Sequence, residues 1–172
     1  MQTYYIFLQE TENSAFENVG SVHAVDAEMA LQNGRDVYAR RVPCFALWAV
    51  PADAVLMRTQ QQLAAEPLTV PQKDSARETY LVCVKRKPAD PPTLAAQVDA
   101  TCLEDALTQA RSAWQAAPEP FWWWVFPRSA VIASTPEDHD PFFAAAESKP
   151  FRESAYYRVI GEIRRIQREG EK

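Results

Sequence analysis

The feature that most constrains this chain is an internal tandem repeat. Shifting the sequence by 76 positions aligns Thr3–Thr59 with Thr79–Thr135 without a gap, and 14 of the 57 aligned pairs are identical. Chance gives roughly one identity in fifteen for ordinary composition. Because a solenoid needs about three or more repeats, we expect instead a pair of like units packed about a pseudo-two-fold axis.

Both copies show the same order of patterns. A β-branched and aromatic segment is followed by a weaker strand, by apolar residues at helical spacing, and by a third strand that ends at a proline. Each unit is therefore predicted to be β-β-α-β, and the whole chain α+β. The predicted strands cover 4–9, 19–24 and 45–50 in the first copy and 80–85, 95–100 and 121–126 in the second, with helices over 27–38 and 103–114.

The sequence predicts four segments: a first unit (1–59), a linker with a short helix (60–78), a second unit (79–151) and a C-terminal amphipathic helix (152–172). The last segment has six basic and four acidic residues. It is therefore expected to form a mildly basic arm on an acidic body. At the helix starts, Asp26 is expected to begin the first helix, and Thr101 with Glu104 predicts a capping box on the second.

The composition argues against most kinds of cofactor, metal and catalytic site. Only four glycines are present, with no GxGxxG or GxxxxGK[ST] loop, and the three cysteines form no CxxC motif. Two histidines without an ExxH motif do not supply a di-iron site. We therefore expect no cofactor, no metal and no catalytic residues in this chain.

The same counts limit the partners and the compartment. A formal net charge of −5 argues against nucleic acid as the main partner, and no apolar run approaches the roughly 20 residues of a membrane helix. Three scattered cysteines without a signal peptide are typical of a reducing cytoplasm.

The most informative local feature is the aromatic strand 121–126. Strand alternation sends Trp122, Trp124 and Phe126 to one face and the residues between them to the other, so both faces are bulky and apolar. One face can cover its own helix, whereas the other must meet the sister unit or a partner. An internal core and a protein-binding surface both remain open.

His23 is the one histidine inside a repeat, and its counterpart 76 residues later is Asp99. The sequence offers it no base, acid or ligand partner, so a structural or interface role is favoured over catalysis.

Two segments of the first copy, Val19–Arg41 and Leu47–Pro51, closely resemble the PaaB family, the small B component of the multicomponent phenylacetyl-CoA epoxidase. The second copy looks like the family's other half over Trp124–Pro127 and Val131–Asp138, and more loosely over Lys149–Arg152 and Tyr156–Tyr157. Ordinary members look like about one unit, whereas this chain is a tandem with an added C-terminal segment.

The resemblance implies a non-catalytic bridging subunit of a di-iron oxygenase that acts on phenylacetyl-CoA or a related aryl-CoA in aerobic phenylacetate catabolism. The implied partners are the di-iron catalytic subunit and its non-catalytic homologue, with the flavin and iron–sulfur reductase as a further one. The candidate contact residues are His23, Arg35, Arg40, Arg41 and Trp48 from the matching segment, and Trp122 and Trp124 from the aromatic strand.

Two alternatives stay open. The chain could be a small α+β enzyme or small-molecule-binding protein with a pocket between the two units. A polar cavity containing His23 would favour that interpretation, and a filled core between the units would count against it. It could also be a general adaptor that binds through its basic C-terminal helix.

Overall fold

The computed structural model describes residues 1–40, 42–66, 68–70, 76–116, 118–138 and 143. The chain is a mixed α/β protein with few helices, in keeping with the α+β prediction. Its strands are β1 (Gln2–Gln9), β2 (Glu17–Ala24), β3 (Ala46–Pro51), β4 (Leu56–Thr59), β5 (Glu78–Lys85), β6 (Thr93–Ala100), β7 (Trp122–Pro127) and β8 (Ile132–Ala133). Its helices are α1 (Ala27–Gly34), continued by a π-helical turn over Arg35–Ala39, α2 (Gln60–Ala65) and α3 (Leu103–Ala113), with 3₁₀ turns at Ala52–Ala54, Arg128–Ala130 and Pro136–Asp138.

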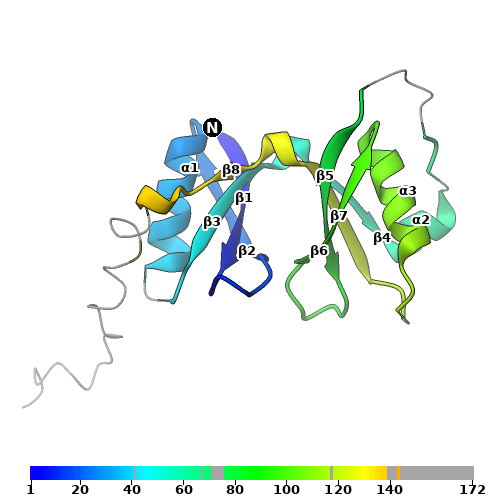
Figure 1. Ribbon diagram of the computed structural model, residues 1–172, viewed down its shortest axis with the longest axis horizontal. Coiled ribbons are helices and arrows are strands. Elements are labelled where there is room, and N and C mark those ends of the chain that lie inside the picture. The colour runs from blue at the N-terminus through cyan, green and yellow to red at the C-terminus, as the bar shows by residue number, and fades with distance from the viewer. Residues whose placement is uncertain (41, 67, 71–75, 117, 139–142, 144–172) are drawn as a thin grey trace, which may run out of the picture.

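The strands form one sheet in the order β4-β7-β5-β6-β2-β1-β3-β8, and every pairing in the described part of the chain is antiparallel. At its middle the ladder between β2 and β6 consists of one residue pair, Glu17 and Thr93. Although β5, β6 and β2 lie between β1 and β7 in this order, the rings of Phe7 and Trp124 are 6.3 Å apart. The sheet therefore folds over at the β2–β6 junction, and its two halves face each other between α1 and α3 (Figure 1).

The two repeats exchange their last strands. β4 follows β3 in the chain but pairs with β7, and β8 follows β7 but pairs with β3. The sequence does not predict β4 or β8, because both are short and their pairing partners lie far away in the chain. Each repeat thus completes the sheet edge of the other.

The 76-residue offset of the sequence persists in the structure. β1 and β5, β2 and β6, and β3 and β7 begin and end 76 residues apart. The register shifts by one residue at equivalent places, between Ile6 and Phe7 and between Val82 and Cys83, as at a β-bulge. The sheet order has the same symmetry. Reading it backwards and exchanging each strand for its counterpart in the other repeat gives the same order again.

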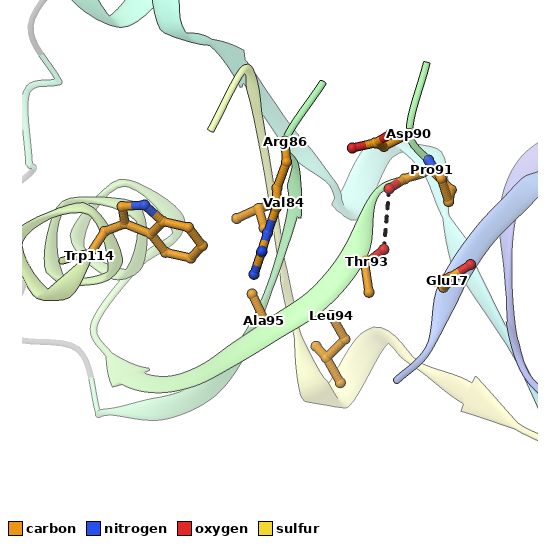
Figure 2. Close-up of a pocket in the computed structure, with 9 residues that line it drawn as sticks. All are labelled: Glu17, Val84, Arg86, Asp90, Pro91, Thr93, Leu94, Ala95 and Trp114. Atoms are coloured by element: carbon orange, nitrogen blue, oxygen red, sulfur yellow. Dashed lines mark hydrogen bonds between the residues drawn. The ribbon is translucent and has the colours of Figure 1, made fainter. Parts of the chain in front are cut away.

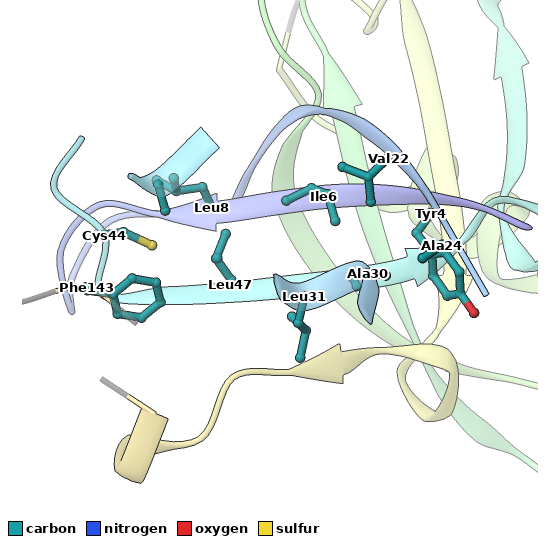
Figure 3. Close-up of a cluster of buried hydrophobic side chains, with 12 residues drawn as sticks. Tyr4, Ile6, Leu8, Val22, Ala24, Ala30, Leu31, Cys44, Leu47 and Phe143 are labelled. Atoms are coloured by element: carbon teal, nitrogen blue, oxygen red, sulfur yellow. The ribbon is translucent and has the colours of Figure 1, made fainter. Parts of the chain in front are cut away.

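Three apolar cores result from strand alternation. The first outer core lies between β1, β3 and α1 and includes Ile6, Leu31, Leu47 and Phe143 (Figure 3). The second outer core packs β5 and β7 against α3. The inner core lies between the two halves of the sheet. The fully or nearly buried members of the second outer core are Leu63, Tyr80, Val82, Val84, Ala100, Ala106, Leu107, Ala110, Trp123 and Val125, and those of the inner core are Phe7, Phe16, Trp48, Val50, Leu81, Cys83, Trp124 and Phe126.

The helix starts follow the sequence in one repeat and depart from it in the other. Asp26 caps α1 as expected, and its carboxylate accepts a hydrogen bond of 2.8 Å from the Met29 amide. The capping box predicted at Thr101 and Glu104 is wrong, because the N-cap is Cys102. The carboxylate of Asp105 instead reaches back to the Thr101 amide, at 3.0 Å.

Candidate interaction surfaces

His23 lies on the exposed part of β2. Its Nδ1 atom is 3.2 Å from the hydroxyl of Thr3 on β1, and its backbone carbonyl accepts a hydrogen bond from Asn33 of α1. The second repeat has the same cross-strand arrangement, with the Thr79 hydroxyl donating to Asp99 at 2.7 Å. A Thr–His pair and a Thr–Asp pair therefore occupy equivalent positions.

The predicted arginines follow α1. Arg35 opens the π-helical turn and forms an ion pair of 2.7 Å with Asp36, and Arg40 is exposed just after this turn. The counterpart of Arg35 is Arg111, which pairs with Glu119 at 2.8 Å. Arg41 lies outside the described residues. His23 thus contacts α1 through Asn33, Arg35 lies within the helical segment 27–39, and Arg40 directly follows it.

The predicted tryptophans lie elsewhere, in and around the inner core. Trp48 stacks on Phe16 with ring centroids 3.5 Å apart, and Trp124 packs against Tyr5 at 4.7 Å. Both indoles are less than a tenth exposed. Trp122 is half-buried against Trp124, with the Lys85 ammonium 6.0 Å from its ring. The sequence did not decide whether this face of the aromatic strand meets the sister unit or a partner. In the structure the sister repeat covers it.

Sequence reasoning missed an apolar strip on the outer face of α1 and its π-helical extension. Val25 and Val37 are each 64% exposed, and Met29 is 41% exposed. Met29 lies in α1 and Val37 in its π-helical extension, and Val25 directly precedes the N-cap Asp26. We call these three residues the α1 strip.

The second repeat is less apolar at the same positions, with two polar residues and one small one. Thr101, Asp105 and Ala113 replace Val25, Met29 and Val37, and the first two belong to a hydrogen-bonded set in which Gln109 donates to Asp105 at 2.9 Å. Hydrogen bonds from Gln109 and from Thr101 hold the pKa of Asp105 below its ordinary value. Comparing the two copies residue by residue would have revealed the strip from sequence.

The buried thiols are poor nucleophiles. Burial raises the pKa of Cys44 to about 12 despite a hydrogen bond to the Ala46 carbonyl, and burial in the inner core raises the pKa of Cys83 as well. Both side chains therefore stay protonated and act as small apolar core residues. Within the described ranges no group of three or more His, Cys, Asp or Glu side chains is placed to hold a metal ion.

Comparison with known proteins now decides the family. The family model described as Phenylacetic acid degradation B (PaaB) matches residues 1–76 and again residues 76–164. The chain belongs to this family. It carries two copies of the family pattern in tandem.

One curated relative is the B component of the 1,2-phenylacetyl-CoA epoxidase of Escherichia coli (strain K12), which is 38% identical over 53 residues. The match covers 31% of this chain and 56% of the relative, so the chain spans about half the length of that protein. No solved structure matches the chain significantly. None of the helices in the described residues is long and apolar enough to cross a membrane.

A cavity of about 500 Å³ lies beside β6, mainly in the second PaaB copy, and Glu17 of β2 contributes to it from the first (Figure 2). It is lined by Glu17, Val84, Arg86, Asp90, Pro91, Thr93, Leu94, Ala95 and Trp114. His23 is absent from this lining, and the space between the two sheet halves is filled by the inner core. The small-molecule alternative requires a pocket between the repeats. Between the two sheet halves, packed aromatic side chains of the inner core occupy that space instead.

Proposed function

We propose that this chain is a cytoplasmic, non-catalytic bridging subunit of a di-iron multicomponent oxygenase. Its substrate would be phenylacetyl-CoA or a related aryl-CoA, degraded in aerobic aromatic catabolism. The observation that carries this proposal is the successive match of both halves of the chain to the PaaB family model. The relative, which is named as a component of a phenylacetyl-CoA epoxidase, supports the substrate class.

The proposed architecture is a fused pair. Residues 1–59 and 79–151 would be two units related by a pseudo-two-fold axis, joined by the linker 60–78 and followed by a C-terminal amphipathic helix over 152–172. The equal spacing of the paired strands and the reciprocal exchange of β4 and β8 support this view. A chain built so presents two related outer faces, which is what a bridge between subunits needs.

The first unit would supply the main contact with the catalytic subunit. The α1 strip offers apolar area at its centre, and His23, Arg35, Arg40 and Arg41 would form its polar border, an arrangement typical of protein interfaces. Trp48, Trp122 and Trp124 would support this contact indirectly, by packing the two sheet halves together in and around the inner core. The non-catalytic homologue of the di-iron subunit, and the flavin and iron–sulfur reductase as a further partner, would complete the complex.

The test is reconstitution from purified components. The chain, purified alone and together with the di-iron oxygenase subunits of its own organism, is assayed for bound iron and for epoxidation of phenylacetyl-CoA with the reductase. We expect a stable complex whose iron resides in the partner subunits, and no turnover by the chain alone. Stoichiometric iron in the isolated chain, turnover without partners, or failure to associate would each contradict the proposal.

A further inference from the structure

We propose that the cavity of the second repeat is a binding site for a small monocarboxylate with an apolar or aromatic body. This inference goes beyond the proposed function and does not depend on any partner subunit. The volume of about 500 Å³ lies within the usual range of small-ligand sites.

The first repeat shows why the second is hollow. In the first repeat the Tyr38 ring lies directly against β2, and its hydroxyl donates to the Ser21 carbonyl at 3.0 Å. This approach requires Gly20, which has φ +143° and at which a Cβ would lie 2.2 Å from the Tyr38 oxygen. The counterpart of Gly20 is Ala96, so an aromatic ring cannot seat on β6 in the same way.

The counterpart of Tyr38 is Trp114, and it forms a wall of the cavity. α3 ends at Ala113, and the Trp114 backbone is extended. Its indole N–H donates to the Ala116 carbonyl at 2.6 Å, and its ring meets the edge of Trp123 at 5.6 Å. In addition, Ala95 replaces the larger Val19, so the floor of the cavity is lowered.

Arg86 supplies the charge that would recognise a carboxylate. Its guanidinium carbon lies 5.9 Å from the centre of the Trp114 ring, and the side chain extends between Trp114 and β6 (Figure 2). In the described part of the chain it forms no ion pair and no hydrogen bond. A guanidinium held against an aromatic face keeps its N–H edge available for a two-point contact with a carboxylate.

The rest of the lining selects among anions. Val84 and Ala95 offer apolar surface for the body of the ligand, while the Leu94 side chain packs into the inner core. Asp90 and Glu17 place two carboxylates at the other end. Two fixed negative charges oppose a phosphate or another polyanion more strongly than one carboxylate that pairs with Arg86. The chemistry therefore fits a monoanion.

The experiment is a calorimetric and NMR titration of the full chain with benzoate and cyclohexanecarboxylate, using benzamide and phenyl phosphate as matched probes. We expect the two carboxylates to bind with dissociation constants of roughly 1–10 mM, as for ligands of this size, and benzamide and phenyl phosphate to bind at least about 10-fold more weakly. Benzoate that fails to bind at about 50 mM, well above that range, or that binds no better than benzamide, would overturn the proposal.

Three variants locate the site. Arg86→Gln is expected to weaken benzoate binding about 10-fold or more, and Lys87→Gln, which removes the same charge one residue away, to leave it within about 2-fold. Ala95→Leu fills the cavity at an exposed strand position and should abolish binding while thermal unfolding monitors the fold. Equal loss in the Arg86 and Lys87 variants, or undiminished binding in folded Ala95→Leu, would show that the carboxylate binds elsewhere.

Discussion

The two repeats of this chain share a backbone plan and differ in what their side chains do with it. Strands, bulges and helices recur 76 residues apart. On the outer helix, however, the first repeat exposes Val25, Met29 and Val37 whereas the second has a polar, hydrogen-bonded set. At the end of that helix the first repeat seats Tyr38 on its sheet and the second leaves a cavity. Duplication with divergence thus allows one fold to offer two different surfaces.

The largest contrast is expected in the outer cores, where Trp123 of the second repeat corresponds to Leu47 of the first, and both are fully buried. Trp123→Ala should lower the free energy of unfolding by about 3–5 kcal/mol and Leu47→Ala by about 2–4 kcal/mol, measured by urea denaturation. Trp123→Phe is the control. Because the buried indole N–H of Trp123 has no hydrogen-bond partner among the residues that the structure describes, this variant should cost clearly less than the alanine variant. A Leu47→Ala loss well above that of Trp123→Ala would contradict the asymmetry.

The next contrast is between Gly20 and Ala96. Gly20→Ala adds a Cβ that collides with Tyr38 at a position of positive φ. We therefore expect the free energy of unfolding to fall by about 1–3 kcal/mol. Ala96→Gly changes an exposed strand position and should cost about 1 kcal/mol or less. Combining Gly20→Ala with Tyr38→Ala relieves the collision and leaves the backbone strain. Equal losses for Gly20→Ala alone and for the double variant would mean that Tyr38 does not constrain this position.

The smallest contrast concerns pH. Since the pKa of Asp105 in the folded chain lies below the ordinary value of 3.8, its stabilising contribution is complete well above pH 3.8 and is lost as the pH falls through that value toward the folded-state pKa. Asp105→Asn should therefore be less stable than the wild type at pH 7, by about 1 kcal/mol or less, and the difference should shrink at pH 3. Met29→Ala changes the equivalent position of the first repeat. Its difference in stability from the wild type should be the same at pH 7 and at pH 3.

The sequence predicted the local part of this fold. β1, β2, β3 and their counterparts lie within two residues of the predicted strands, because alternation, helical spacing and terminal prolines are local signals. The exchanged strands β4 and β8 were not predicted, because a short strand is stabilised here by a partner in the other repeat. For the same reason the sequence could not decide what covers the face with Trp124, which the first repeat covers with Tyr5 and Phe7.

The candidate site was predicted only in part. His23, Arg35 and Arg40 border the outer helical segment of the first repeat, and their types alone indicated a polar surface. The α1 strip escaped notice because single exposed apolar residues are normal on any protein surface. The cavity escaped notice because it depends on where the Trp114 ring lies after α3 ends, which no local pattern encodes.

The most direct test of the account compares one surface change in the two repeats. Val37→Asp places a charge at the centre of the proposed contact, and Ala113→Asp places the same charge at the equivalent exposed position of α3. Affinity for the purified di-iron oxygenase subunits is measured by biolayer interferometry for both variants and the wild type. We predict at least a 10-fold weaker complex for Val37→Asp, as for an interface hot spot, and a change within about 2-fold for Ala113→Asp. Equal weakening by both variants, or by neither, would contradict the claim that the outer helix of the first repeat is the docking face.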